Sequence, residues 1–292
     1  MSLVTEPTRN LTITKLGPAL AAEITGIDLN QPLTSQQVEQ LHAAWKEHMV
    51  LRFRGQAALT LKNLVDFSRQ FGTLDKRPTV SYEMSAEHDA LPDEITVISN
   101  IRSGGKPLGA LGDGEAVWHA DMTYNPRPPK GAVLYSKEVP PTGGNTHFAN
   151  MCAAYEALEP ILKKRVETLS CVHDASRNSA GELRLGYAEN DDPRKTVGAT
   201  HPLVMEHPQT GRRYLMLGRR RNAYVMGLSL EDSEALLDRL WSHATQPCFS
   251  WAQVWTTSDV VMWDNRCTLH RRDSFDPATR RLMYRTQISA DR

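Results

Sequence analysis

The sequence lacks most features that would place it in a specialised structural class. Its 292 residues include only four cysteines, and none of them has the CxxC spacing of a zinc or redox motif. Scattered thiols in a chain of this length suit a reducing compartment, so we expect a cytoplasmic protein. Internal repeats and low-complexity linkers are also missing. The length allows one large domain or two modest ones.

Net charge and long apolar runs are absent as well. Lys+Arg and Asp+Glu number 34 each, so no overall field draws the chain to nucleic acid or to an anionic membrane. The longest apolar runs, such as PALAAEI at 18–24, fall far short of a membrane span. The first residues lack the basic patch and apolar core of a secretory signal. We therefore expect neither a nucleic-acid partner nor a membrane location.

Hydrophobic periodicity predicts helices near the N-terminus and many short strands after them. Helical spacing covers residues 34–50, 59–72, 152–169 and 229–246. Strand patterns cover residues 11–34, 49–56, 131–150, 249–256, 259–266 and 281–289. This order favours an α+β chain built on a β-sandwich or barrel.

One segment predicts neither kind of element. Residues 73–115 are rich in proline, glycine, serine and charge, and we expect a long irregular stretch there. Structureless loops of this length are uncommon in compact domains unless they are functional lids or disordered. Residues 76–115 are therefore our candidate for a lid that orders over an active site.

A histidine and an aspartate stand two residues apart in the apolar stretch EAVWHADMTYNP at 115–126. On a strand, residues i and i+2 point to the same face, so His119 and Asp121 can present an imidazole and a carboxylate side by side. These two ligands leave a divalent metal underligated. A second, distant histidine would complete the set of two histidines and one carboxylate that leaves three positions open on non-haem iron.

The C-terminal stretch supplies that histidine together with two arginines. His270 follows a buried-looking strand and a polar turn, and Arg281 and Arg285 share one face of the strand after it. An apolar strand that points two arginines one way needs anionic partners there, because an unpaired buried charge is costly. The planar guanidinium matches a carboxylate. A metal triad beside such an arginine is the minimum apparatus of an oxygenase that uses a 2-oxo acid.

The motifs WHADMTY, GGNTHFAN and WDNRCTLHRR…RRLMYRTQI resemble the signatures of the taurine/2,4-dichlorophenoxyacetate dioxygenase family. The resemblance runs from about residue 17 to the C-terminus. It implies one Fe(II)- and 2-oxoglutarate-dependent domain over residues 1–292, with a double-stranded β-helix (jelly-roll) core flanked by helices. It also implies a role for each matching residue: His119, Asp121 and His270 as iron ligands, Thr146 and Arg281 as ligands of 2-oxoglutarate, and Arg285 beside the metal.

The family chemistry implies hydroxylation of a substrate C–H by O₂, while 2-oxoglutarate becomes succinate and CO₂. The aspartate at position 121 argues for hydroxylation, because halogenating relatives have no carboxylate there. Hydroxylation beside a leaving group would end in bond cleavage, and the sequence leaves both outcomes open. We expect no catalytic residue beyond the metal ligands. Relatives of this type form dimers or tetramers, so we expect a homo-oligomer.

The resemblance is weaker where substrate would bind. Positions that contact taurine in the taurine enzyme are occupied here by Arg77, Val80, Glu115, Asn178, Ser179 and Arg221. These departures argue against taurine and for another small organic anion, of the carboxylate, sulfonate or sulfate type. The candidate substrate residues are Arg77, Arg221 and Arg285 as anion partners, Glu115 as a cation partner, Asn178 as a polar contact, and Tyr124 as an aromatic wall.

Two other functional classes remain for comparison. A metal-dependent hydrolase or isomerase on the same barrel would not need Thr146 and Arg281 at co-substrate positions, and it would need a separate general base. A non-catalytic protein on a decayed oxygenase fold should have lost a ligand or the arginine, and this chain has lost neither. The complete set favours the oxygenase.

Overall fold

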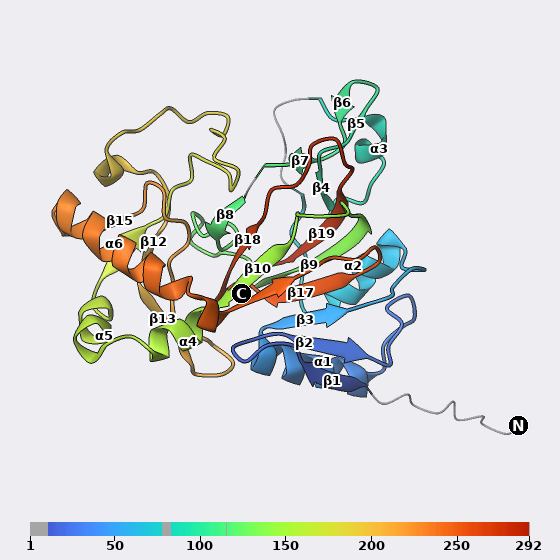
Figure 1. Cartoon of the computed structure of the whole chain (residues 1–292), viewed down its shortest axis with the longest axis horizontal. Coiled ribbons are helices and arrows are strands. Elements are labelled where there is room, and N and C mark those ends of the chain that lie inside the picture. Colours follow the sequence, from blue (N-terminus) through green and yellow to red (C-terminus); the bar gives the residue numbers. More distant parts are fainter. Residues whose placement is uncertain (1–10, 78–82, 115, 292) are drawn as a thin grey trace, which may run out of the picture.

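The computed structural model describes residues 11–77, 83–114 and 116–291, and Figure 1 colours them by sequence. Val80 and Glu115 lie outside the described residues. The α-helices are α1 (Ser35–His48), α2 (Leu61–Arg69), α3 (Ala86–Asp89), α4 (Met151–Glu156), α5 (Pro160–Val166) and α6 (Leu230–Ala244). The strands are β1 (Thr12–Lys15), β2 (Ala22–Thr25), β3 (Val50–Phe53), β4 (Thr96–Ser99), β5 (Arg102–Ser103), β6 (Lys106–Pro107), β7 (Ala110–Leu111), β8 (Ala116–His119), β9 (Gly131–Glu138), β10 (Thr146–Asn150), β11 (Ser170–Val172), β12 (Thr200–Pro202), β13 (Val204–Glu206), β14 (Arg213–Leu215), β15 (Tyr224–Val225), β16 (Ser250–Gln253), β17 (Val260–Asp264), β18 (Thr268–Arg272) and β19 (Leu282–Ile288).

Two sheets carry the functional residues. The larger has eight strands in the order β1-β2-β3-β17-β9-β19-β4-β7, and the smaller has four in the order β16-β10-β18-β8. Most neighbours pair antiparallel, including β9 with β19 and β10 with β18. Helices beside mainly antiparallel sheets confirm the α+β class that the sequence predicts.

The two sheets pack against each other through one apolar cluster. Trp263 and Met283 come from the larger sheet, and Phe148 comes from the smaller one. On the other face of the larger sheet, α1 and α2 bury Trp45 and Phe67 in a second cluster. Hydrophobic burial thus fixes the larger sheet between the helices and the smaller sheet.

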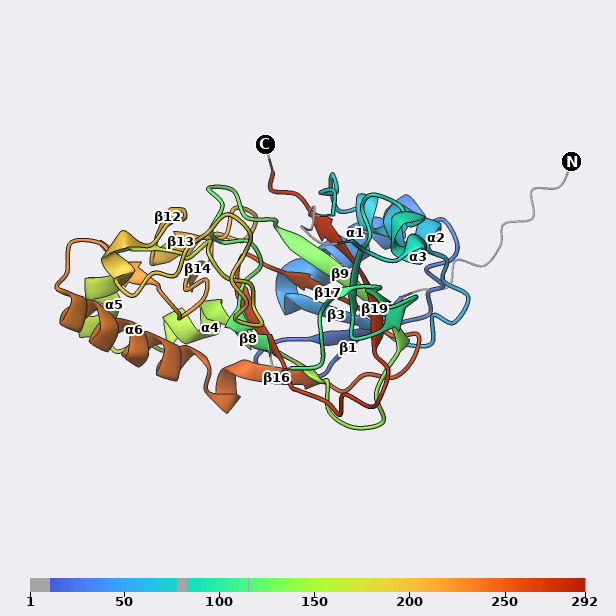
Figure 2. The ribbon, with the colours of Figure 1, turned by 90° about the horizontal axis from the view of Figure 1, so that it is seen from above.

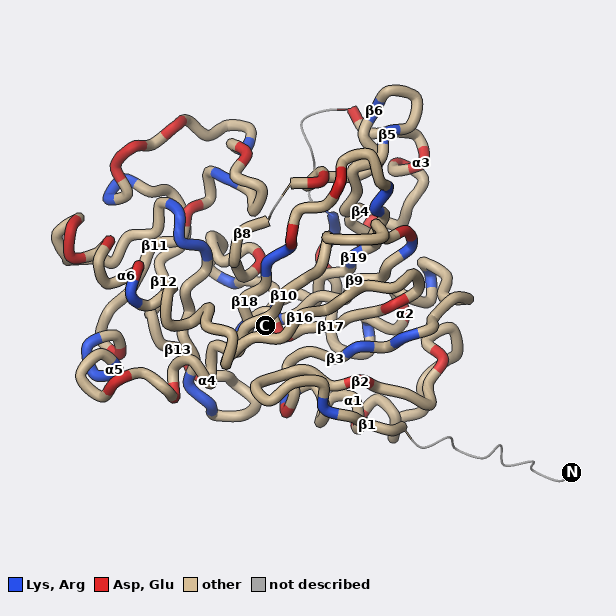
Figure 3. The backbone as a smooth tube through the Cα atoms, in the orientation of Figure 1, with Lys and Arg blue, Asp and Glu red and all other residues tan. Residues whose placement is uncertain are grey.

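A third apolar cluster holds the region around α4, α5 and α6 with β11 to β15. Figures 1 and 2 show this region on one side of the molecule, opposite α1 and α2. Figure 3 shows basic and acidic positions scattered over both sides of the molecule, in keeping with the balanced composition. None of the helices in the described ranges is long and apolar enough to cross a membrane.

Two predictions of local structure were wrong. The segment 73–115 is not a continuous irregular stretch, because β4 pairs with β19 inside the larger sheet. The single helix predicted over residues 152–169 is two helices, α4 and α5. Pro160 begins α5, where its missing N–H costs nothing, but the same residue would interrupt a continuous helix.

Candidate active site

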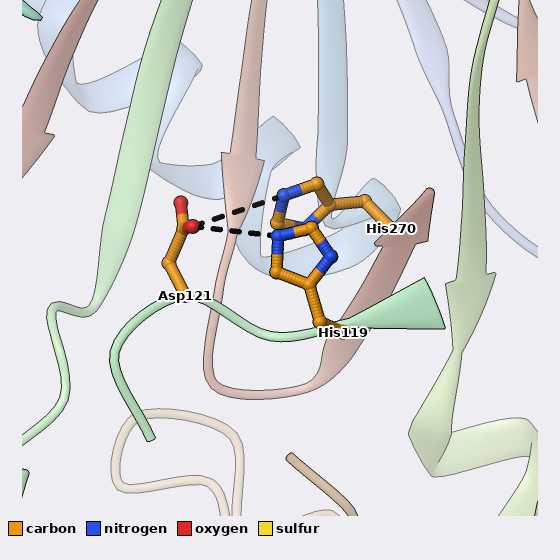
Figure 4. Close-up of side chains that lie close together, drawn as sticks. All are labelled: His119, Asp121 and His270. Carbon is orange, nitrogen blue, oxygen red and sulfur yellow. Dashed lines mark ion pairs between the residues drawn. The ribbon is translucent and has the colours of Figure 1, made fainter. Parts of the chain in front are cut away.

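The strand pairing brings the three predicted metal ligands together. His119 ends β8, and its register partner on β18 is His270. The Nε2 atoms of His119 and His270 lie 3.7 Å and 4.0 Å from the Asp121 Oδ1 atom (Figure 4). All three side chains are buried, and their ligand atoms lie within 4.8 Å of one another. This convergence of two imidazoles and one carboxylate can hold a divalent metal ion on one face.

Hydrogen bonding presents the correct nitrogen of His119 to the metal. Its Nδ1 atom lies 2.7 Å from the carbonyl oxygen of Val117, so Nδ1 carries the proton and donates it there. That tautomer, assigned from the hydrogen bond, leaves a lone pair on Nε2. Burial and the neighbouring His119 ring lower the pKa of His270 well below its usual value. The lowered pKa suits His270 to the neutral form that binds metals.

Asp121 is held by its backbone as well as by its side chain. The Asn265 Oδ1 atom accepts a hydrogen bond from the Asp121 amide at 2.7 Å, and Asn265 Nδ2 donates to the Asp121 carbonyl at 2.9 Å. Met122 then turns the chain with a φ of 53°. Sequence reasoning assigned Asn265 only to a turn, since its partner lies 144 residues away.

Arg285 is the cationic partner of the Asp121 carboxylate. Its Nη1 atom lies 3.1 Å from Asp121 Oδ2. Burial by itself would raise the pKa of the Asp121 carboxyl, but Arg285 and the two histidines outweigh burial and hold this pKa well below its usual range. Asp121 is therefore an anion at neutral pH.

Arg281 is buried and has no anionic partner among the residues that the structure describes. Only 2% of the residue is exposed, and its Nε and Nη1 atoms have no hydrogen-bond partner among the described residues. Burial and the nearby Arg272 lower its pKa to about 9, which still leaves a cation at neutral pH. A buried unpaired cation is costly, and an incoming carboxylate would offset that cost.

Thr146 lines the same small cavity as Arg281, His119 and His270. Its Oγ1 atom accepts a hydrogen bond from the Trp255 indole at 3.0 Å, which leaves the hydroxyl proton free for another acceptor. None of the described residues around this cavity carries a carboxylate. Two carboxylate-binding groups beside an iron-type ligand set fit 2-oxoglutarate, whose two ends are a chelating 2-oxo acid and a second carboxylate.

Arg272 also lines this cavity, and sequence reasoning missed it. It is the register partner of Thr146 across β10 and β18. Its Nη2 atom donates to the carbonyl of Leu111 at 2.9 Å, while its Nε atom has no partner in the described ranges. The signal was the second arginine after His270, which strand alternation places on the same face as the histidine.

A larger cavity of about 450 Å³ opens onto His119, Asp121 and Arg285. Of the other predicted substrate residues, Arg77, Tyr124 and Asn178 line it. Arg221 is exposed and is not among its lining residues, whereas Arg219, two residues earlier, is buried and lines it. The backbone bridge between Arg219 and His119 explains the difference, because it turns Arg219 towards the metal site.

A second buried group of potential ligands consists of His207, Asp264 and Cys267. Asp264 is already neutralised there: it lies 2.5 Å from the Arg266 Nη2 atom and 3.0 Å from His207 Nε2. This closed ion pair packs beside Asn265 and supports the turn between β17 and β18. We assign it a structural role.

The fold and the site together define a metal-dependent enzyme with a carboxylate-bearing co-substrate. The sequence profile of the taurine catabolism dioxygenase TauD, TfdA family matches residues 12–287. The chain belongs to this family, and it is an Fe(II)- and 2-oxoglutarate-dependent dioxygenase. This membership confirms the resemblance found in the sequence and favours the oxygenase over the hydrolase or isomerase.

Several named proteins are similar to this chain over nearly its whole length. The (S)-phenoxypropionate/alpha-ketoglutarate-dioxygenase of Sphingobium herbicidovorans is 36% identical over 289 residues, which covers 96% of this chain and 95% of that protein. The alkylsulfatase of Acinetobacter baylyi is 34% identical over 275 residues, with 92% and 82% covered. The crystal structure of AAD-2 with Mn(II) and N-oxalylglycine has a TM-score of 0.78 and 31% identity, with 97% and 98% covered.

Proposed function

We propose that this enzyme hydroxylates a C–H bond of a small organic anion with an apolar body, of the carboxylate, sulfonate or sulfate type. The observation that carries the proposal is the cavity of about 450 Å³ beside the metal ligands, in which arginines interrupt a largely apolar wall. A relative is named for phenoxypropionate and another for alkyl sulfates, and both names describe an acidic group on an apolar chain or ring.

His119, Asp121 and His270 would hold the iron, which supplies O₂ activation when bound. Arg281 and Thr146 bind and orient the second carboxylate of 2-oxoglutarate, and the buried Trp255 indole keeps the Thr146 hydroxyl proton directed away from itself. Arg285 holds Asp121 in its ionised, ligating form. The apolar walls exclude water, which favours oxidation of the substrate carbon over side reactions.

We further propose that the two packed sheets form a double-stranded β-helix core and that residues 1–292 make one catalytic domain. The antiparallel pairing of β10 with β18 opposite that of β9 with β19 supports this arrangement. Met84, His88 and Thr96, from the described part of 76–115, line the cavity. The lid role of this segment, the homo-oligomer and the cytoplasmic location stay predictions.

The test has two stages, so that cofactor binding and substrate choice are separated. Anaerobic addition of Fe(II) and 2-oxoglutarate to the metal-free protein should produce the visible charge-transfer band of the chelate, which His270→Ala should abolish. Succinate release is then measured with phenoxyacetate, hexyl sulfate and hexanesulfonate, and with the neutral phenoxyethanol as control. We expect stimulation by at least one anion. A normal chelate band with no stimulation by any anion would overturn the proposed substrate class.

A further inference from the structure

We infer that Arg184 and Arg219 form the subsite for the anionic headgroup of the substrate, with the Tyr124 ring as its backing. The inference rests on the proposed function, and it names the residues that select the anion. It also places the headgroup away from Arg285, the arginine next to the metal.

Of the other two arginines on the cavity wall, one pairs with an acid and one donates to two backbone carbonyls. Arg285 pairs with Asp121 at 3.1 Å. The Arg77 Nη1 atom donates to the carbonyl oxygens of His88 at 3.0 Å and Leu91 at 3.3 Å. Arg184 and Arg219 are the remaining arginines among the described lining residues. They are the cations best placed to accept a ligand.

Arg219 is a buried cation, and one of its N–H donors has no partner among the described residues. It is 9% exposed, and its Nη1 atom donates to the carbonyl of Arg177 at 2.6 Å. Its Nε atom is buried and has no partner among the described residues. Burial and the charge of Arg184 lower its pKa to about 10, so the guanidinium remains protonated at neutral pH.

Arg184 is held in place by an aromatic ring instead of an acid. Its guanidinium carbon lies 4.0 Å from the centre of the Tyr124 ring. Within the described ranges its side chain makes neither an ion pair nor a hydrogen bond. A stacked guanidinium uses its flat face for the ring and leaves its N–H edge available to an anion.

No acidic side chain in the described ranges forms an ion pair with Arg184 or Arg219, although the charges of Asp121 and Asp174 offset part of the burial of Arg219. Glu182 lines the same cavity, but its Oε2 atom accepts a hydrogen bond from Asn178 Nδ2 at 2.6 Å. The two neighbouring cations repel each other, and burial also removes Arg219 from water. A carboxylate or sulfate offers several acceptor oxygens and would relieve both costs at once.

The other residues that line the cavity indicate what kind of ligand body fits it. Apolar side chains line the cavity around the metal ligands, namely Val97, Ile98, Leu111, Met122 and Leu183. Tyr124 stands three residues after the metal-binding Asp121. A ligand whose headgroup sits at Arg184 and Arg219 would therefore lay its apolar part along this wall, with a C–H bond next to the iron site.

The experiment uses the holoenzyme with Fe(II), saturating 2-oxoglutarate and whichever anion stimulates the wild type most. Arg184→Gln and Arg219→Gln remove one cation each, and Arg184→Lys keeps the charge without the planar fork. Arg221→Gln is the matched control, because Arg221 is exposed and outside the cavity wall. Succinate release gives KM and kcat, and the anaerobic chelate band gives 2-oxoglutarate affinity separately.

We expect KM for the anion to rise about 10- to 100-fold in each glutamine variant, which is the loss of a charge-assisted hydrogen bond. Affinity for 2-oxoglutarate should be unchanged, Arg184→Lys should recover part of KM, and Arg221→Gln should match the wild type. If Arg219→Gln has a lower melting temperature than the wild type, its KM also reflects lost stability, and the KM of Arg184→Gln is then the test of the subsite. An unchanged KM in Arg184→Gln overturns the subsite while the proposed function stands. A wild type that no anion stimulates overturns both.

Discussion

At the scale of single residues, Arg281 best links the structure to the chemistry, because the Nε and Nη1 atoms of its guanidinium have no partner among the described residues. Strand alternation predicts its direction, but only the folded chain shows that none of the described acidic residues pairs with it. Its 2% exposure makes the isolated charge costly for the ligand-free protein. A carboxylate of 2-oxoglutarate, bound as we propose, would offset that cost.

Replacement of Arg281 by methionine should weaken co-substrate binding and yet stabilise the ligand-free protein. We expect affinity for 2-oxoglutarate to fall about 10- to 100-fold, because charge-assisted hydrogen bonds are lost. The free energy of unfolding without ligands should rise by about 1 kcal/mol, because a buried unpaired charge is removed. Chelate-band titration and urea unfolding measure the two effects. Arg280→Met, at an exposed neighbour paired with Glu138, is the control, and it should not change co-substrate affinity.

Two buried histidines should make the metal-free protein sensitive to mild acid. Burial lowers the pKa of His173 to about 3, and it lowers the pKa of His270 well below 6.5. Below pH 6.5 the unfolded chain takes up protons that the folded chain refuses, so stability falls as pH falls. Each group contributes up to about 1.4 kcal/mol per pH unit. Urea unfolding between pH 7 and pH 5 should give a shallower slope in His270→Gln and in His173→Gln; slopes equal to wild type in both would contradict this origin.

At the scale of elements, the turn between β17 and β18 acts as a clamp on the loop after β8. Asn265 joins the two by its hydrogen bonds to the Asp121 backbone, and it also donates to the carbonyl of Pro129 at 2.9 Å. The side chain is 1% exposed, so these bonds are shielded from water. The position of the predicted metal ligand Asp121 thus depends on the side chain of Asn265.

Replacement of Asn265 by alanine should therefore loosen Fe(II) binding without removing a ligand. Losses of this kind reduce metal affinity about 10- to 100-fold. A competition titration with a chromogenic chelator measures the affinity, and the charge-transfer band checks that the remaining chelate is normal. Asn125→Ala, on the same loop, is the comparison. Equal affinities in Asn265→Ala and the wild type would show that the loop holds Asp121 by itself.

Local sequence patterns predict some helices and strands of this protein but not others. The helices over 34–50, 59–72 and 229–246 were predicted well, since each combines an apolar stripe with a cap: Thr34, Thr60 and Ser229 all accept from the backbone. β4 was missed because its four residues lie within a polar, glycine-rich segment. Its partner β19 follows it by more than 180 residues, and no local pattern carries that pairing.

At the scale of the whole molecule, the site lies where two sheets and a loop-rich region meet. The predicted metal ligands come from β8, the loop after it and β18, while Arg281 and Arg285 come from the β19 segment of the larger sheet. The sheets are held together by the cluster around Phe148 and Trp263. Ligands that bridge the sheets should therefore stabilise the fold as a unit.

Fe(II) and 2-oxoglutarate together should raise the melting temperature more than either alone. A ligand at about 100 times its Kd adds about 2.7 kcal/mol of stability to the native state. Anaerobic calorimetry of the wild type should show this increase. In Arg281→Met the increment from 2-oxoglutarate should shrink while that from Fe(II) persists, and loss of both increments would contradict separate roles for the two groups.

The sequence by itself determined the parts of this protein that depend on residue type and short spacing. The pair His119 and Asp121, the later His270 and the arginines of the last strand identify the chemistry, because metal coordination and carboxylate binding need those side chains. The tertiary structure decided which charges are already satisfied. It paired Arg285 with Asp121, left Arg281 unpaired, and turned Arg219 rather than Arg221 into the cavity. Those outcomes depend on contacts between strands far apart in the chain, which local periodicity does not encode.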